Sequence, residues 1–104
     1  GDAAGPVQAY LEALASREAD TMVSLSCADW EAQARTDLEA FSAVTITLED
    51  ASCVVSGEEG ETTLVSCTGK IIANYGNEIL EVDLSERTYL AVFEAGEWRM
   101  CGYR

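Results

Sequence analysis

The apolar residues of this chain follow a helical period up to Phe41 and an alternating period from there to the end. The first part predicts three helices, because apolar side chains recur there every three or four residues. Pro6 suits the first position of the first helix, and Asp20 is expected to cap the second. The third is expected to begin with Ser26 or Asp29 as its cap, and its apolar stripe consists of Trp30, Ala34, Leu38 and Phe41.

The alternating part predicts four strands, over residues 44–56, 61–75, 78–94 and 97–104. Turn-forming runs join them: GEEG at 57–60, NYGN at 74–77 and EAGE at 94–97. Helices followed by an antiparallel meander define an α+β architecture of three N-terminal helices packed on a bent four-stranded sheet. The length of 104 residues suits one domain, with residues 1–5 expected to be a linker or an expression remnant.

The turns also predict which residues lie opposite each other: Cys53 and Cys67, Ile71 and Leu80, Phe93 and Trp98. Side-chain alternation then gives one largely apolar face toward the helices. It contains Cys53, Val55, Val65, Cys67, Ile71, Leu80, Val82, Leu84, Leu90, Val92 and Cys101. Strand one changes phase near Asp50, which predicts a bulge, and Gly69 in mid-strand predicts a sharp bend.

Four cysteines occur at wide spacings, with no CxxC pair and no histidine anywhere in the chain. This pattern disfavours a zinc site or a thioredoxin-like motif and favours two disulfides. Cys53 lies opposite Cys67 in the predicted hairpin, and the inward Cys101 is left to pair with Cys27 at the junction of the second and third helices. Two disulfides imply an extracytoplasmic location, secreted, periplasmic or tethered at the cell surface. The alternative is four buried free thiols in a cytosolic protein.

Acidic residues outnumber basic residues 19 to 6, which gives a formal net charge of −13. A surface this negative repels phosphate backbones and anionic lipid headgroups, so nucleic acid is not an expected partner. No window approaches the roughly 18 apolar residues that a membrane span needs, so no membrane insertion is expected in this segment.

The order of three helices and a strongly bent meander resembles the nuclear-transport-factor-two-like fold, also called the cystatin-like α+β roll. The final run YLAVFEAGEWRMCGYR is similar to the terminal hairpin of small exported bacterial domains of that superfamily, including lipoproteins of unknown function. The resemblance implies this fold and a domain that is exported from the cytoplasm. It says little about function, because the superfamily includes isomerase-like and cyclase-like enzymes, protein-binding adaptors and uncharacterised exported domains.

Catalytic chemistry has no candidate residue in this sequence. There is no histidine and no nucleotide-binding or metalloprotease motif, and the predicted inward face of the strands carries no carboxylate. We therefore expect no cofactor and no metal, and the chain is more in keeping with a binding domain than with an enzyme.

Two functional hypotheses follow. The first is a non-catalytic exported domain that forms a homodimer or docks a protein partner through the outer sheet face, with Tyr89, Phe93, Trp98 and Met100 as the interface. Against this, the curl of the sheet could bring the helices or the N-terminal segment over these side chains. The second is a binder of a small apolar ligand, or an enzyme, that uses the cone between helices and sheet, with Tyr10 and Trp30 lining the pocket. A cavity with an inward carboxylate would favour the second.

Overall fold

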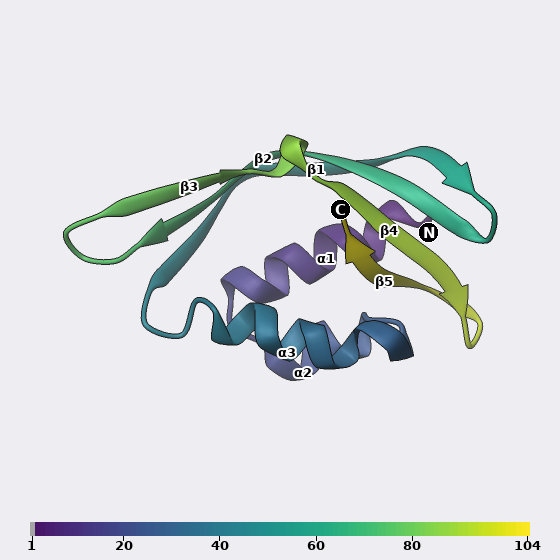
Figure 1. Cartoon of the computed structure of the whole chain (residues 1–104), viewed down its shortest axis with the longest axis horizontal. Coiled ribbons are helices and arrows are strands. Elements are labelled where there is room, and N and C mark those ends of the chain that lie inside the picture. The colour runs from purple at the N-terminus through teal and green to yellow at the C-terminus, as the bar shows by residue number, and fades with distance from the viewer. Residues whose placement is uncertain (1) are drawn as a thin grey trace.

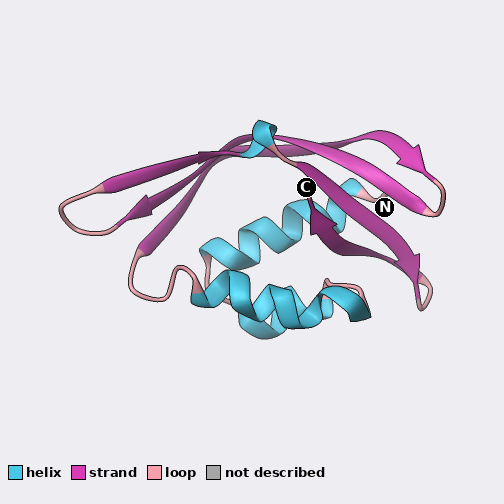
Figure 2. Cartoon of the chain, in the orientation of Figure 1, coloured by secondary structure: helices cyan, strands magenta, loops and turns pink. Residues whose placement is uncertain are grey.

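The computed structural model describes residues 2–104. The helical part contains α1 (Ala4–Ala15), α2 (Ala19–Ser24), the 3-10 turn η1 (Ala28–Trp30) and α3 (Glu31–Glu39). The strands are β1 (Thr45–Glu59), β2 (Thr62–Asn74), β3 (Ile79–Asp83), β4 (Thr88–Glu94) and β5 (Glu97–Tyr103), with a second 3-10 turn, η2 (Leu84–Glu86), before β4. Helices first and antiparallel strands afterwards confirm the predicted α+β class (Figure 2).

The first helix begins earlier than the position of Pro6 suggests. The α1 helix starts at Ala4, whose N–H donates to the Asp2 carboxylate at 3.0 Å, two residues before Pro6. Ala3 and Ala4 are buried in the core, so the prediction of a linker over residues 1–5 is wrong for this part; Gly1 lies outside the described residues.

The other two predicted caps are also displaced. Asp20 lies in the first turn of α2, whose N-cap is Glu18. The third helical segment opens with η1 after Cys27, and neither Ser26 nor Asp29 caps it through its side chain.

The sheet arches over the helices, and its strand order is β1-β2-β4-β5 (Figure 1). The central strand β2 pairs with β1 along one edge. Along the other edge its N-terminal half pairs with β4 and its C-terminal half with β3. The α1 helix packs on the concave face against β1, and α2 packs against both α1 and α3. The core therefore lies between α1 and the inner face of the curled sheet.

The curl originates where β1 and β2 approach each other closely. The register of β1 shifts between Glu49 and Ser52, and Asp50 has a φ of 53°. Gly69 lies across from this bulge with a φ of 103°, and a Cβ atom there would lie 2.6 Å from the carbonyl oxygens of Glu49 and Asp50. Only glycine fits this backbone approach. The predicted bulge and the predicted bend are both confirmed.

The second hairpin differs from the predicted register by two residues. Ile71 lies opposite Val82 instead of Leu80, because the loop before β3 is longer than a two-residue turn. A slip of two residues keeps the same side chains on the same face. Leu80 is nevertheless 47% exposed and Val55 43% exposed, so these two predictions of inward core positions are wrong.

The predicted third strand is interrupted, and the interruption reverses its faces. The η2 turn separates β3 from β4, so that Tyr89 and Ala91 are buried while Leu90 and Val92 lie on the other face, only partly buried. The predicted Phe93–Trp98 pair is present, but a bulge follows it before Tyr89 pairs with Tyr103. The inward assignment of Leu90, Val92 and Cys101 is therefore wrong.

Both predicted disulfides are present, Cys53–Cys67 and Cys27–Cys101. The second forms for a reason other than the predicted one. The segment before η1 runs beside the edge strand β5, where the Cys27 N–H donates to the Met100 carbonyl and the Met100 N–H donates to the Leu25 carbonyl, each at 2.8 Å. This edge pairing places Cys27 next to Cys101. Two disulfides indicate an oxidising environment.

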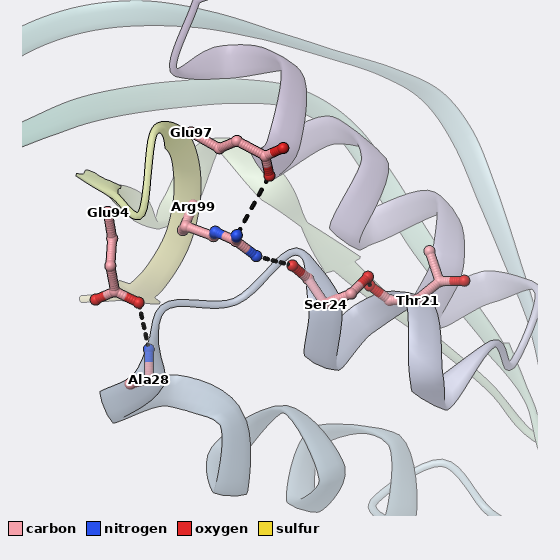
Figure 3. Close-up of polar contacts among 6 residues, drawn as sticks. All are labelled: Thr21, Ser24, Ala28, Glu94, Glu97 and Arg99. Carbon is pink, nitrogen blue, oxygen red and sulfur yellow. Dashed lines mark hydrogen bonds and ion pairs between the residues drawn. The ribbon is translucent and has the colours of Figure 1, made fainter.

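Polar contacts add to this attachment of the last hairpin to the helices (Figure 3). The Arg99 guanidinium donates to the Ser24 carbonyl oxygen and forms an ion pair with Glu97 at 3.3 Å. The Ala28 N–H at the start of η1 donates to the Glu94 carboxylate at 3.0 Å. The β4–β5 hairpin is thus fixed to α2 and η1 by side chains as well as by the disulfide.

Candidate functional site

A cavity of about 150 Å³ lies between α1, α3 and the concave face of the sheet. Its apolar wall consists of Leu11, Leu14, Ala40, Phe41, Ile71 and Val82. Its polar groups come from four separate elements and from the residue that follows η2: Tyr10, Asp37, Arg87, Tyr89 and Tyr103. An apolar pocket with a few convergent polar groups is typical of a site for a small molecule.

The Asp37 carboxylate is the acceptor on which one set of these groups converges. The Tyr10 hydroxyl donates to it at 2.8 Å and the Tyr103 hydroxyl at 3.2 Å. The side-chain amide of Gln33 donates at 3.3 Å. The Trp30 indole N–H in turn donates to the Tyr10 oxygen at 3.1 Å. Three donors from the protein therefore already engage this carboxylate.

The two phenols that hold Asp37 remain protonated donors at neutral pH. Burial raises the pKa of Tyr10 far above its usual value, and the neighbouring Asp37 carboxylate adds to this increase. Burial also raises the pKa of Tyr103, again with a contribution from the negative charge of Asp37. Because a phenolate here would be desolvated and close to a carboxylate, these groups suit hydrogen bonding better than proton transfer.

Arg87 and Tyr89 provide donors of a different kind, because neither is paired with a carboxylate. The guanidinium carbon of Arg87 lies 4.2 Å from the ring centroid of Tyr103, a cation–π contact. Within residues 2–104 its side chain forms no ion pair, and it lies close enough to the Tyr89 hydroxyl to lower the pKa of that group. The Tyr89 hydroxyl is buried and has no hydrogen-bond partner among the same residues. Burial raises the pKa of Tyr89, and the positive charge of Arg87 opposes this effect.

The structure brings one of the two predicted pocket residues to the cavity wall. Tyr10 lines it, whereas Trp30 stands behind Tyr10 and positions its hydroxyl. Asp37 was not identified from the sequence. It lies seven residues after Trp30 and four before Phe41, so the spacing of the apolar stripe already places it on the inner face of α3.

Two of the four residues predicted for the outer interface are buried in the structure. Tyr89 is 1% exposed and Met100 is fully buried, because the η2 turn reverses the faces of the last hairpin; both belong to the core. Phe93 is 60% exposed and packs edge-to-face against the partly buried Trp98, with ring centroids 5.4 Å apart. Only these two remain on the outer surface.

Two further searches of residues 2–104 gave negative results. No cluster of three or more potential metal ligands is present in this range. No helix in it combines the length and the apolar character that crossing a bilayer requires.

Comparison with known proteins identifies the fold. No family model and no curated protein sequence matches the chain. Among solved structures, the chain is similar to a proposed dehydratase of the nuclear-transport-factor-two-like family from Streptomyces avermitilis, with a TM-score of 0.62 and 16% identity over 94% of this chain and 87% of that one.

Two other structures are similar over nearly the whole chain. A SEC-C motif-containing protein from Rhodopseudomonas palustris matches with a TM-score of 0.58 and 12% identity, over 98% of this chain and 78% of that one. The helical cell shape determining protein Pgp2 from Campylobacter jejuni matches with the same TM-score and identity, over 95% of this chain and 38% of that one. Identities this low show the fold alone: the chain has a nuclear-transport-factor-two-like fold.

Proposed function

We propose that this protein is an extracytoplasmic domain that binds a small, mainly apolar molecule in the cavity between α1, α3 and the sheet. The observation that carries this proposal is the cavity itself, which has an apolar wall and a buried tyrosine hydroxyl without a partner. Fold neighbours that include a proposed dehydratase are compatible with a ligand in this place. The two disulfides support the extracytoplasmic location.

The size of the cavity limits the ligand to about one six-membered ring with a small substituent. A cavity of about 150 Å³ lined by leucine, isoleucine and phenylalanine side chains in another protein holds benzene. The apolar part of the wall here has the same chemical character, and the cavity has about the same volume. Steroid-sized or polyketide-sized molecules are too large for it.

Binding suits this site better than acid–base catalysis. A general base must be free to accept a proton from its substrate. The Asp37 oxygens instead accept from Tyr10, Tyr103 and Gln33, and the two phenols are poor acids in this environment. The network positions side chains around the cavity and occupies most of the acceptor positions of its one carboxylate.

The proposal is tested by titrating ¹⁵N-labelled protein with benzene and following backbone amide shifts. We expect saturable shifts at Leu11, Leu14 and Ile71. Ala40→Leu should weaken binding at least tenfold, because Ala40 lines the cavity while remaining exposed, and a larger side chain there obstructs it. Ala32→Leu is the matched control, since Ala32 is exposed on α3, the helix that Ala40 follows, and does not line the cavity. Shifts that stay linear in benzene concentration, or that Ala40→Leu leaves unchanged, would contradict the proposal.

A further inference from the structure

The cavity carries an imbalance between donors and acceptors. Its one carboxylate, Asp37, accepts from three side chains of the protein. Its one guanidinium, Arg87, has no carboxylate partner among residues 2–104, and the buried hydroxyl of Tyr89 has no acceptor there. A buried donor without an acceptor is costly, so a structure that retains one gains from a ligand that supplies the acceptor.

Arg35 and Arg87 are the two basic residues within 2–104 that neither pair with a carboxylate nor donate to the main chain, although the sequence has 19 acidic residues and 6 basic ones. Arg35 is exposed to solvent on α3. Lys70, Arg99 and Arg104 each pair with a glutamate, and Arg17 donates to main-chain carbonyl oxygens. Arg87 is instead half-buried at the cavity wall and stacked over Tyr103. Its planar fork of N–H groups matches the geometry of a carboxylate.

We propose that the cavity binds a small carboxylate with an apolar body, whose two oxygens accept from the Arg87 guanidinium and the Tyr89 hydroxyl. The inference rests on the proposed function and adds the ligand class to it. The apolar body lies against Leu11, Leu14 and Ile71. Asp37 is held by three donors of the protein, so most of its capacity to accept is already used. The net charge of −13 works against any anion, so a preference for an anion must come from local donors.

Three probes of nearly identical shape separate charge from fit: benzoate, benzamide and benzamidine, which are anionic, neutral and cationic at about pH 7. We expect calorimetry to give benzoate an affinity at least tenfold above benzamide, with benzamidine the weakest. Arg87→Gln should abolish the preference for benzoate while benzene still binds. Arg35→Gln is the matched control, because it removes the same charge from an exposed position on α3 outside the cavity.

Tyr89→Phe distinguishes a ligand contact from a structural role. Removing a buried hydroxyl that has no partner should leave the melting temperature of the free protein unchanged or higher, yet it should weaken benzoate binding at least threefold. A variant that loses stability and keeps benzoate affinity would overturn the role of Tyr89.

The outcomes separate the two proposals. If neither benzene nor the three isosteres binds in the cavity, the proposed function fails together with this inference. If benzene binds but benzoate binds no better than benzamide, or if benzamidine binds best, only the assignment of a carboxylate ligand is overturned.

Discussion

Replacing Gly69 by alanine tests whether the curl of the sheet depends on the contact between the β1 bulge and β2. Alanine at a φ of 103° costs about 1–2 kcal/mol for the left-handed backbone. Its Cβ would also lie 2.6 Å from two main-chain carbonyl oxygens, which belong to backbone and cannot rotate away. Overpacking of this kind costs about 1–3 kcal/mol more. We expect Gly69→Ala to lower the free energy of unfolding by about 2–5 kcal/mol.

Gly76→Ala is the matched control for this variant. Gly76 has a similar φ of 96°, but a Cβ atom there meets nothing within 4 Å. Both substitutions reduce the entropy of the unfolded chain to the same extent, so that effect cancels in the comparison. Urea denaturation of the oxidised proteins, followed by circular dichroism, should show a loss for Gly69→Ala that exceeds the loss for Gly76→Ala by at least about 1 kcal/mol. Equal losses would refute the close approach of β1 to Gly69 as the cause of the bend.

Three further predictions follow from the packing. Removing the second disulfide with Cys27→Ser and Cys101→Ser should cost about 4–5 kcal/mol, because it closes a loop with a sequence separation of 74; a loss below about 2 kcal/mol in urea denaturation would contradict this estimate. Met100→Ala should lower the free energy of unfolding by about 2–5 kcal/mol, whereas Phe93→Ala, at an exposed position, should lower it by less than about 1 kcal/mol. If Phe93→Ala melts at a lower temperature than Met100→Ala, the placement of Met100 in the core is wrong. Stability should decrease as pH rises above about 10. The pKa of Tyr10 is higher in the folded protein than in the unfolded chain, so the unfolded chain loses this proton first. Tyr10→Phe should flatten the slope of melting temperature against pH above about pH 10, and an unchanged slope would assign it to other groups.

The sequence predicts well what turn residues and glycine positions determine locally. The turn around Gly60 places Cys53 opposite Cys67, and both the bulge near Asp50 and the bend at Gly69 are signalled by residues that would be unfavourable in a regular strand. These features depend on backbone geometry within one hairpin. They can therefore be derived without knowledge of the rest of the fold.

The faces of the last hairpin could not be derived in this way. The run from Tyr89 to Phe93 is apolar in both phases, so alternation does not indicate which side chains face the helices. The η2 turn decides the phase, and it contains no proline or glycine that would signal an interruption. Pairing of β4 with β2 then buries Tyr89 opposite Val65, a contact that turn lengths alone do not predict.

The candidate site could be predicted from the sequence only in part, for a related reason. The search for an inward carboxylate considered the strands, whereas Asp37 lies on α3 within an otherwise polar stretch. Arg87 follows a turn whose position was not predicted. The cavity is lined by α1, α3 and four strands that are distant in sequence, and the curvature of the sheet brings them together.

The most direct test of the central claim is the location of benzoate in the complex, measured by isotope-filtered nuclear Overhauser effects from its ring protons to the methyl groups of labelled protein. The account predicts contacts to Leu11, Leu14 and Ile71, from the helical and the sheet side of the same cavity. Contacts only to the exposed methyl groups of Val54 or Ile79 on the outer part of the sheet would contradict it.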